Sequence, residues 1–275
     1  MKSALVTGNK GFVGSKLLKA LLARGFEANG IDDEYFHEGD WRVNLEKTLN
    51  SFESHFIFHV GACSDTLSKD VQDMMIKNYE STKFIAQWCK ENSRKLIYSS
   101  SAACYGVDHK NPSNLYGWSK YAAEDYVVNS GGVALRYFNV YGPGETNKGK
   151  MASFALQAYI KNLRKDRVFL FPGQPRRDFV FIDDVVEANL HAMSNFEDIY
   201  GEYFEVSTGV SSTFENILDF MNIPFEYTLS SEIPSGYQYF TCGNQSKWIP
   251  GWKPKYTLES GLDEYIKFLQ CEMNI

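Results

Sequence analysis

The sequence of 275 residues lacks the features that mark several specialised classes of protein. It has no excess of basic residues, because 28 Lys and Arg against 34 Asp and Glu give a formal net charge of −6. That charge argues against general binding to nucleic acid or to an anionic membrane, and we expect neither as a partner. No uninterrupted apolar run approaches the roughly 20 residues of a membrane span. The chain also holds no internal repeat and no low-complexity linker.

Cysteine is scarce and scattered. The five cysteines are odd in number and form no CxxC motif, so they do not make a disulfide framework. The five histidines do not cluster with them at ligand spacing, and we predict no metal site. The amino terminus shows no signal-peptide pattern, so we expect a cytoplasmic protein in a reducing compartment.

What the chain has is the balance of a globular protein, with 44% hydrophobic and 23% charged residues. In its first half, strand-like segments alternate with helical ones. Strands are predicted at residues 3–6, 27–31, 56–60, 95–98 and 132–138, and helices at residues 12–22, 71–91 and 116–128. This order predicts an α/β fold, a Rossmann-type doubly wound parallel sheet with helices on both faces.

The second half changes character. Helices are predicted at residues 151–161, 183–193, 214–221 and 258–269, and strands at residues 168–171, 178–181 and 202–206. The last strand is expected to return to the first sheet. We therefore expect a dinucleotide-binding Rossmann domain of residues 1–140 plus about 178–206. The remaining residues, about 141–177 plus 207–275, would form a smaller α/β C-terminal substrate lobe that shares a cleft with it.

A glycine-rich turn joins the first predicted strand to the first helix. Gly8, Gly11 and Gly14 are spaced as G-x-x-G-x-x-G. Such a turn lets the backbone approach a pyrophosphate closely and present the N-terminal amides of the helix to it. A tight turn without a ligand is the plain alternative, but the acidic residues that end the second strand favour a dinucleotide site.

Those acidic residues, Asp32 and Asp33, bear on the choice of cofactor. A carboxylate at this place accepts hydrogen bonds from the ribose hydroxyls of NAD and repels the 2′-phosphate of NADP. The next basic residue along the chain is Arg42, so the local chemistry favours NAD. One of the two acids is expected to cap the strand end and face solvent.

A second motif is the pair Tyr116 and Lys120, whose spacing of four places both on one face of a predicted helix. A nearby ammonium favours the phenolate, so Lys120 is expected to make Tyr116 an acid or base at neutral pH. Lys120 would also hold the cofactor ribose. An exposed helix pair is the alternative, but the serines of residues 99–101, at the end of a predicted strand, favour a catalytic one.

The glycine turn, the strand-end serines and the YxxxK pair together resemble the short-chain dehydrogenase/reductase superfamily. The additional C-terminal segment resembles its extended branch, the NAD-dependent epimerase/dehydratase family, which acts on nucleotide sugars. The resemblance implies a nucleotide-diphosphate sugar as substrate and a homo-oligomer as the assembled form. It also points to NADP, whereas the two aspartates point to NAD, so the cofactor is expected to be NAD(P).

A narrower resemblance covers nearly the whole chain. Residues 59–64 (HVGACS), 136–143 (RYFNVYGP), 147–153 (NKGKMAS), 176–180 (RRDFV) and 237–240 (YQYF) are similar to the ADP-L-glycero-D-manno-heptose 6-epimerase family. The Lys-Gly-x-Met-Ala-Ser stretch is the most discriminating of them. The resemblance implies an epimerase that inverts carbon six of an ADP-heptose.

The same resemblance assigns the site residues. The catalytic residues would be Ser101, Tyr116, Lys120 and, as a second acid or base, Lys148. The cofactor would contact the amides of Phe12 and Val13, and also Gly61, Ala62, Cys63, Ser64, Asn78 and Val140. The substrate would contact Asn139, Lys150, Gln157, Phe171, Pro172, Gly173, Gln174, Arg177 and Tyr237. Lys150 and Gln157 stand where the family has a serine and a histidine, so the sugar pocket is altered.

Chemistry explains why two proton-transfer groups are needed. A secondary alcohol with no acidic C–H can be inverted by hydride removal to NAD(P)⁺ and hydride return to the opposite face of the ketone. When the sugar end turns over, its oxygen needs a second proton donor in a different place. Tyr116 would serve one orientation and Lys148 the other, provided that burial or Lys150 lowers the pKa of Lys148. A loop lysine that binds diphosphate as a point charge is the alternative.

Other functions stay open at this point. Another nucleotide-sugar epimerase or a reductase would use the same scaffold, and a non-catalytic dinucleotide sensor would share its cofactor site. A 4,6-dehydratase is disfavoured, because Ser101 is followed by two alanines where elimination needs an acid. The chain is short for the family in the loop after Asp33 and in residues 106–114, so the exact sugar is left open.

Overall fold

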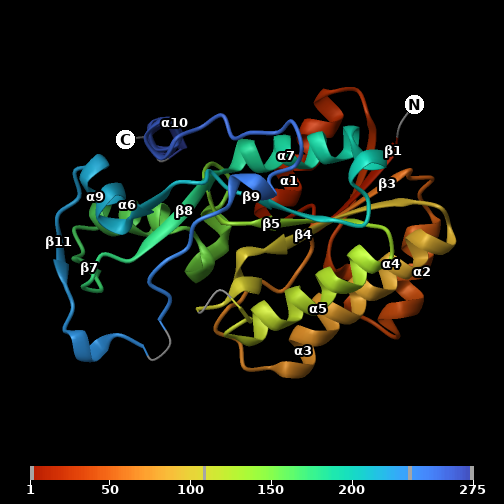
Figure 1. Cartoon of the computed structure of the whole chain (residues 1–275), viewed down its shortest axis with the longest axis horizontal. Coiled ribbons are helices and arrows are strands. Elements are labelled where there is room, and N and C mark those ends of the chain that lie inside the picture. Colours follow the sequence, from red (N-terminus) through yellow and green to blue (C-terminus); the bar gives the residue numbers. More distant parts are fainter. Residues whose placement is uncertain (1–2, 108–109, 235–236, 273–275) are drawn as a thin grey trace.

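The computed structural model describes residues 3–107, 110–234 and 237–272, and its main feature is a six-stranded parallel sheet (Figure 1). Every adjacent pair of strands in this sheet is parallel. The order across the sheet is β2 (Glu27–Ile31), β1 (Ser3–Thr7), β3 (Phe56–His59), β4 (Lys95–Ser101), β5 (Val133–Tyr137) and β9 (Tyr203–Val206). The predicted α/β fold with a Rossmann-type parallel sheet is therefore confirmed, including the return of the last strand to the sheet.

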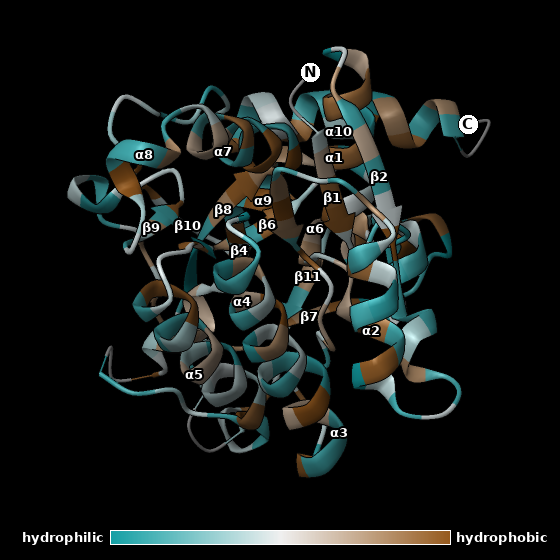
Figure 2. Ribbon diagram, turned by 90° about the vertical axis from the view of Figure 1, so that its right-hand side faces the viewer, coloured by the Kyte–Doolittle hydropathy of each residue, from teal (hydrophilic) through white to brown (hydrophobic). Residues whose placement is uncertain are grey.

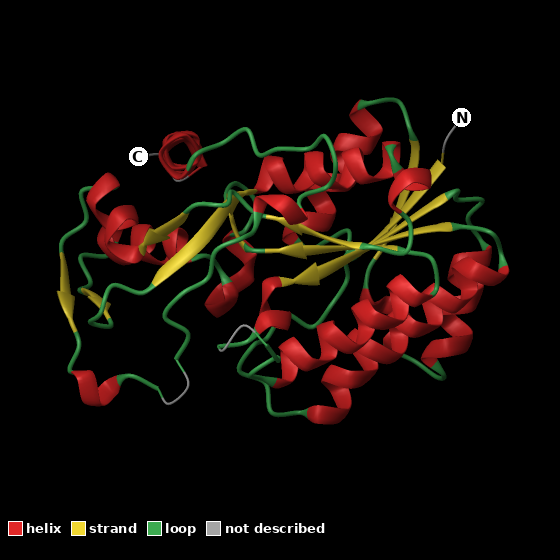
Figure 3. Ribbon diagram, in the orientation of Figure 1, coloured by secondary structure: helices red, strands yellow, loops and turns green. Residues whose placement is uncertain are grey.

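Helices cover both faces of the sheet, as Figure 3 shows. On one face, α1 (Phe12–Ala23) contacts α7 (Ile182–Ser194), and the short α8 (Phe196–Ile199) follows. On the other face lie α2 (Trp41–Asn50), α3 (Val71–Met75), α4 (Ser81–Glu91) and α5 (Leu115–Asn129). Because both faces are covered, the central strands β1 and β3 are buried along their whole length, whereas the edge strand β2 is partly exposed. Figure 2 shows hydrophobic strands between helices with hydrophilic outer surfaces.

The helix predicted for residues 71–91 is not uniform. A π-helical turn, Ile76–Glu80, separates α3 from α4. Such turns insert an extra residue into an α-helix and are frequent at functional sites. Here the turn contains Asn78, which is buried and bonded to the chain that follows β3. The apolar period of the sequence identified the helix but could not indicate the change of winding.

Helix α2 was not predicted. It begins after Asp40, whose side chain accepts a hydrogen bond from the Arg42 N–H at 2.9 Å. Two leucines, Leu45 and Leu49, are its buried residues. So narrow an apolar face in a polar segment gives little periodic signal. The segment expected as a loop after Asp33 therefore consists of a 3-10 turn (Asp33–Phe36) followed by helix α2. It adds no strand to the sheet.

A smaller lobe lies beyond the carboxyl ends of the strands (Figure 1). It contains the sheet β10 (Ser211–Thr213), β8 (Arg176–Phe181), β6 (Asn139–Tyr141) and the pair β11 (Phe225–Tyr227) and β7 (Val168–Leu170). Its helices are α6 (Phe154–Leu163), α9 (Phe214–Phe220) and α10 (Leu258–Glu272). The expected domain boundaries at 140 and about 178 fall inside β6 and β8, which pair with each other, so the division into domains stays a prediction.

The remaining helical elements are short 3-10 segments: Ala102–Tyr105, Thr146–Met151, Ser230–Glu232 and Gln245–Lys247. Thr146–Met151 is interrupted by a kink at Gly149. In the shortened loop of residues 106–114, residues 108 and 109 lie outside the described part of the chain. Among the described residues, no helix is both long enough and apolar enough to cross a membrane.

Candidate active site

A cavity of about 590 Å³ opens where the main sheet meets the lobe. It lies at the loops that follow β1, β3, β4 and β5, which is where open parallel sheets bind ligands. Predicted site residues from all of these loops line it: Gly8, Gly11, Phe12, Val13, Gly14, Asp32, Gly61, Ala62, Ser64, Ser101, Tyr116, Lys120, Asn139, Val140, Lys148 and Lys150. The tertiary structure thus brings together side chains that span nearly 150 positions of the sequence.

The glycine turn has the geometry of an anion cradle. Gly8 has φ +68°, and a Cβ on Gly14 would lie 2.2 Å from the Gly8 carbonyl oxygen. Helix α1 begins after Gly11, which offers no side-chain cap, and the first turn holds no acidic residue. The first amides of α1 are therefore left for another acceptor, as binding of a pyrophosphate requires. The turn fits the dinucleotide that the sequence predicts.

The two aspartates after β2 are placed differently. Asp32 lines the cavity and accepts a hydrogen bond from the Lys10 N–H at 2.9 Å. Asp33 is exposed, and its carboxylate lies 3.4 Å from the His37 ring. Sequence reasoning missed Glu34, whose carboxylate forms an ion pair with the Lys10 ammonium. The tertiary structure thus places the cation of Lys10 beside the acids that follow β2, which the order of residues along the chain did not indicate.

Cys63 and Asn78 stand behind the cavity wall. The Asn78 Oδ1 accepts from the Cys63 N–H at 2.7 Å, and its Nδ2 donates to the Cys63 carbonyl at 2.9 Å. These bonds fix the loop after β3, which includes Gly61, Ala62 and Ser64. Neither Cys63 nor Asn78 lines the cavity, and a contact of either with a cofactor stays a prediction.

Two further residues that sequence reasoning missed support the same loop. The Thr7 hydroxyl accepts from the Gly61 N–H at 3.0 Å and bonds to Nδ1 of His59 at 2.7 Å. Burial lowers the pKa of His59 to about 3, with the charge of Lys120 as a second cause, so the imidazole is neutral. In the sequence, the position of His59 at the end of an apolar strand is the feature that could have indicated this role.

The Tyr116 phenol and the Ser101 hydroxyl lie close together on the cavity wall beside Lys120. Burial raises the pKa of Tyr116 to about 12. Burial also lowers the pKa of Lys120 to about 7. Desolvation disfavours the charged form of both side chains, and Lys120 is not among the groups that shift the pKa of Tyr116. Tyr116 is therefore a neutral phenol, and the expectation that Lys120 favours the phenolate stays a prediction.

Lys148 lies on the 3-10 turn Thr146–Met151, with its ammonium 5.1 Å from the centre of the Phe12 ring. It is half-buried, and burial lowers its pKa, while the charge of Glu145 raises it. Of the two causes expected from the sequence, burial and Lys150, burial is the one found to lower the pKa of Lys148. Lys150 is exposed and lines the cavity two residues further on.

Gln157 lies outside the cavity lining, on helix α6. Its side-chain amide donates to the carbonyls of Lys150 at 3.3 Å and Ala152 at 2.7 Å. It therefore supports the turn that carries Lys148 from behind. A direct contact between Gln157 and substrate stays a prediction.

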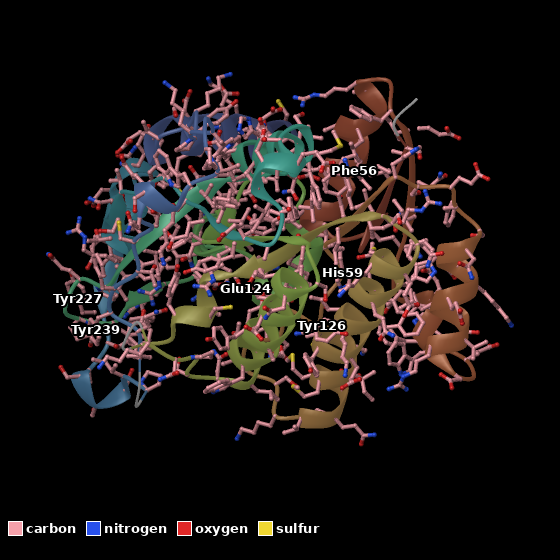
Figure 4. The ribbon with its side chains drawn as sticks, turned by 45° about the vertical axis from the view of Figure 1, so that its right-hand side comes forward. Phe56, His59, Glu124, Tyr126, Tyr227 and Tyr239 are labelled. Carbon is pink, nitrogen blue, oxygen red and sulfur yellow. The ribbon has the colours of Figure 1, made fainter. Side chains whose placement is uncertain are left out.

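The other predicted substrate residues lie together in the lobe. The Arg177 guanidinium lies over the rings of Phe214 and Tyr237, 5.5 and 5.6 Å from their centres. Phe171 meets Tyr237 edge to face at 4.9 Å, at the start of the loop with Pro172, Gly173 and Gln174. This group does not line the main cavity, whereas Phe214 does. In Figure 4 the lobe residues Tyr227 and Tyr239 lie far from His59 and Glu124 of the main domain.

The charges of the cavity differ in sign from that of the whole chain. Lys120, Lys148 and Lys150 line it, and Asp32 is the acid among its lining residues. An anionic ligand is therefore met by local cations in a protein of net charge −6. No group of three His, Cys, Asp or Glu that could hold a metal occurs among residues 3–107, 110–234 and 237–272.

Comparisons with known proteins agree with this geometry. Residues 4–206 match the model of the NAD dependent epimerase/dehydratase family. The ADP-L-glycero-D-manno-heptose-6-epimerase of Brachyspira hyodysenteriae is 33% identical over 311 aligned positions, which cover 97% of each protein. Because the alignment is longer than the chain of 275 residues, it contains gaps in this sequence.

Solved structures of epimerases are also similar to this chain. The Helicobacter pylori ADP-L-glycero-D-manno-heptose-6-epimerase superposes with a TM-score of 0.84 at 26% identity, covering 98% of this chain and 96% of that one. The Thermus thermophilus UDP-glucose 4-epimerase, solved in complex with NAD, superposes with a TM-score of 0.82 at 23% identity, covering 98% and 99%. The second likeness concerns the fold alone.

Proposed function

The chain belongs to the NAD dependent epimerase/dehydratase family, and from this premise we propose that it is an ADP-glycero-manno-heptose 6-epimerase. It would oxidise carbon six of the sugar transiently to a ketone and return the hydride to the opposite face. One observation carries the proposal: two separate proton-transfer groups, Tyr116 of α5 and Lys148 of the Thr146–Met151 turn, line the same cavity. A reductase or a dinucleotide sensor has no need of the second group.

NAD, held through residues of the Rossmann sheet, is the cofactor we propose. The free amides at the start of α1 would bind its pyrophosphate, and Asp32 would accept from its ribose hydroxyls. The Asp32 carboxylate on the cavity wall disfavours a 2′-phosphate. When bound, the nicotinamide supplies reversible hydride acceptance, and all proton transfer falls to the protein.

The protonation states divide the proton transfers between the two groups. Lys148, whose pKa is lowered by burial, is the group that would take the proton of the sugar hydroxyl during oxidation. After the sugar end turns over, the Tyr116 phenol donates its proton to the ketone oxygen during reduction. Ser101, which lies close to the phenol, would orient it. In the reverse reaction the two groups exchange roles, and exchange with solvent restores both.

Local cations are proposed to hold the substrate diphosphate. Lys150 lines the cavity, and Arg177 lies beyond it between Phe214 and Tyr237. Aromatic and apolar groups of the lobe, Phe171 with the loop to Gln174, would contact the nucleotide, and Asn139 would contact the sugar. The substrate would then span from the lobe to the catalytic wall.

The test is turnover of ADP-D-glycero-D-manno-heptose in ordinary and in deuterated water. We expect the 6-epimer, no net consumption of NAD and no deuterium at carbon six. Deuterium at carbon six would contradict direct hydride return. Net oxidation or reduction of the cofactor would identify a reductase, turnover of UDP-glucose in its place would identify a 4-epimerase, and cofactor binding without any turnover would identify a sensor.

We also propose a homo-oligomer in the cytoplasm. Trp118 and Tyr121 of α5 are 48% and 41% exposed and meet edge to face, which gives the helix an apolar patch on its outer side. All five cysteines lie in the described part of the chain, and all are free thiols, which suits a reducing compartment. Light scattering coupled to gel filtration would report the mass, and a monomer at micromolar concentration would contradict the assembly.

A further inference from the structure

Glu145 is a carboxylate in the lobe whose exposed fraction is 0%. Its oxygens accept from the Ser153 N–H at 2.5 Å, the Ser153 hydroxyl at 2.6 Å, the Tyr265 hydroxyl at 3.0 Å and the Gly142 N–H at 3.3 Å. Taking a carboxylate out of water is costly unless its oxygens are satisfied in this way. Four donors satisfy the Glu145 carboxylate, so this buried acid is a structural element of the lobe.

The donors lie at the two ends of one segment, residues 142–153, which we call the lysine segment because Lys148 lies within it. Gly142 begins the segment, and Ser153 ends it as the N-cap of α6. One carboxylate therefore joins both ends of the chain that carries Lys148. Tyr265, from α10 near the end of the described chain, anchors the same carboxylate to the body of the lobe.

Between its ends, the lysine segment is held by a backbone hydrogen bond and by contacts with Gln157. The Lys148 N–H donates to the Glu145 carbonyl at 2.9 Å, and Gly149 adopts φ +54°. Gln157 supports the later part from α6. A turn with exposed residues on both sides of Lys148 depends on its fixed ends for a defined position.

We propose that Glu145 is a positioning residue for Lys148: its buried carboxylate clamps both ends of the lysine segment and so places the Lys148 ammonium beside Phe12 at the cavity wall. Its catalytic consequence rests on the proposed function, because Lys148 is there the second proton-transfer group. The clamp itself is a property of the fold and is testable without turnover.

Charge gives the clamp a second effect. The Glu145 carboxylate raises the pKa of Lys148, against the lowering by burial. The other charged or titratable groups around Lys148 are Lys150 on the same segment, Lys16 of α1 beside Gly144, and Tyr116 and Lys120 of α5 across the cavity. Tyr265 of α10 bonds to Glu145 and stays a neutral phenol, because burial raises its pKa.

The decisive variant is Glu145→Gln, which keeps the size of the side chain but removes its charge and cannot accept all four bonds. We expect kcat to fall by about 10- to 100-fold, as misplacement of a catalytic group by about 1 Å does. KM and NAD binding should change by less than about threefold, since Lys148 holds neither the cofactor nor the lobe contacts.

A second measurement does not need activity. The rate at which a small amine-acylating reagent labels Lys148 is followed against pH by mass spectrometry, because only the neutral amine reacts. In Glu145→Gln the rate at high pH, where the amine is neutral in both proteins, should rise for Lys148 because the released segment exposes it, while the rate for Lys161, exposed on α6, stays fixed. If wild-type protein turns over no ADP-heptose, the proposed function fails, and this labelling still decides the role of Glu145.

Asp184→Asn is the matched control. Asp184 is also a buried acid that anchors a loop, through the N–H groups of Lys255 and Tyr256 at 2.8 and 3.0 Å, but it lies away from the cavity. It should lower the melting temperature and leave kcat per folded molecule and the Lys148 labelling profile unchanged. Equal effects of both variants, or an unchanged rate of Lys148 labelling at high pH in Glu145→Gln, would overturn the proposal.

Discussion

The Lys120 ammonium lies 4.2 Å from the centre of the Tyr98 ring, in the interior of the main domain. Tyr98 in turn stacks on the His59 ring at a centroid distance of 5.7 Å. The face of an aromatic ring attracts a cation that has lost its water, so Tyr98 gives Lys120 part of what solvent would give. The Lys120 ammonium thus lies on the face of the Tyr98 ring, and Tyr98 stacks on the neutral imidazole of His59.

This arrangement predicts how stability depends on pH. The pKa of Lys120 is about 7 in the folded protein and near 10.5 when unfolded. Below pH 7 Lys120 is charged in both states, and the folded state bears the full free-energy cost of burying that charge. Between pH 7 and 10.5 the unfolded state binds more protons, so this cost falls as pH rises. Lys120→Met should therefore stabilise the protein most at pH 6 and little near pH 10, as measured by thermal unfolding.

Lys161→Met provides the control for that series, since Lys161 is exposed on α6. Its effect on the melting temperature should be small and independent of pH. A stabilisation by Lys120→Met that is equal at pH 6 and pH 10 would show that the folded pKa of Lys120 is not lowered.

Tyr116→Phe tests the acid of the proposed reduction. It removes the hydroxyl and keeps the ring, so we expect a loss of kcat of about 10²- to 10⁴-fold, the usual worth of a general acid. NAD binding, measured by quenching of tryptophan fluorescence, should change little. Turnover within about threefold of wild type would exclude Tyr116 as the proton donor.

Lys148→Ala tests the second proton-transfer group. We expect epimerisation to fall by about 10²- to 10⁴-fold while NAD binding persists, because Lys148 is one of two groups that move protons. The measurement is single-turnover epimer formation followed by NMR. If KM rises and kcat is kept, Lys148 binds the diphosphate as a point charge and is not an acid or base.

Asp32→Ala tests the choice of cofactor. Its carboxylate lines the cavity, so its loss should weaken NAD binding by about tenfold, the effect of one lost charge-assisted hydrogen bond, and improve NADP binding. Titration calorimetry with both dinucleotides measures the change. Asp33→Ala is the matched control, since Asp33 is exposed beside His37, and it should alter neither affinity. Equal effects at the two positions would contradict this division.

Much of the architecture could be predicted from local pattern. The strand at residues 27–31 has the predicted bounds, and the apolar runs of the other main-sheet strands are visible in the sequence because both of their faces are covered. Helix α2 and the short strands β6, β10 and β11 were missed. Each is short or largely polar, so its conformation depends on its neighbours and not on an apolar period.

The site shows the same division. The residue types and spacings of the sequence determined which groups are available: the glycine turn, the acid after β2, the Tyr–Lys pair and the lysine in its glycine-bearing turn. The tertiary structure alone decided their state. Burial keeps Tyr116 a phenol and brings Lys120 close to neutrality, and a carboxylate held by residues as distant as Tyr265 places Lys148. The reason is that a pKa and a position depend on desolvation and on neighbours in space, which separations of up to 120 residues conceal from any local pattern.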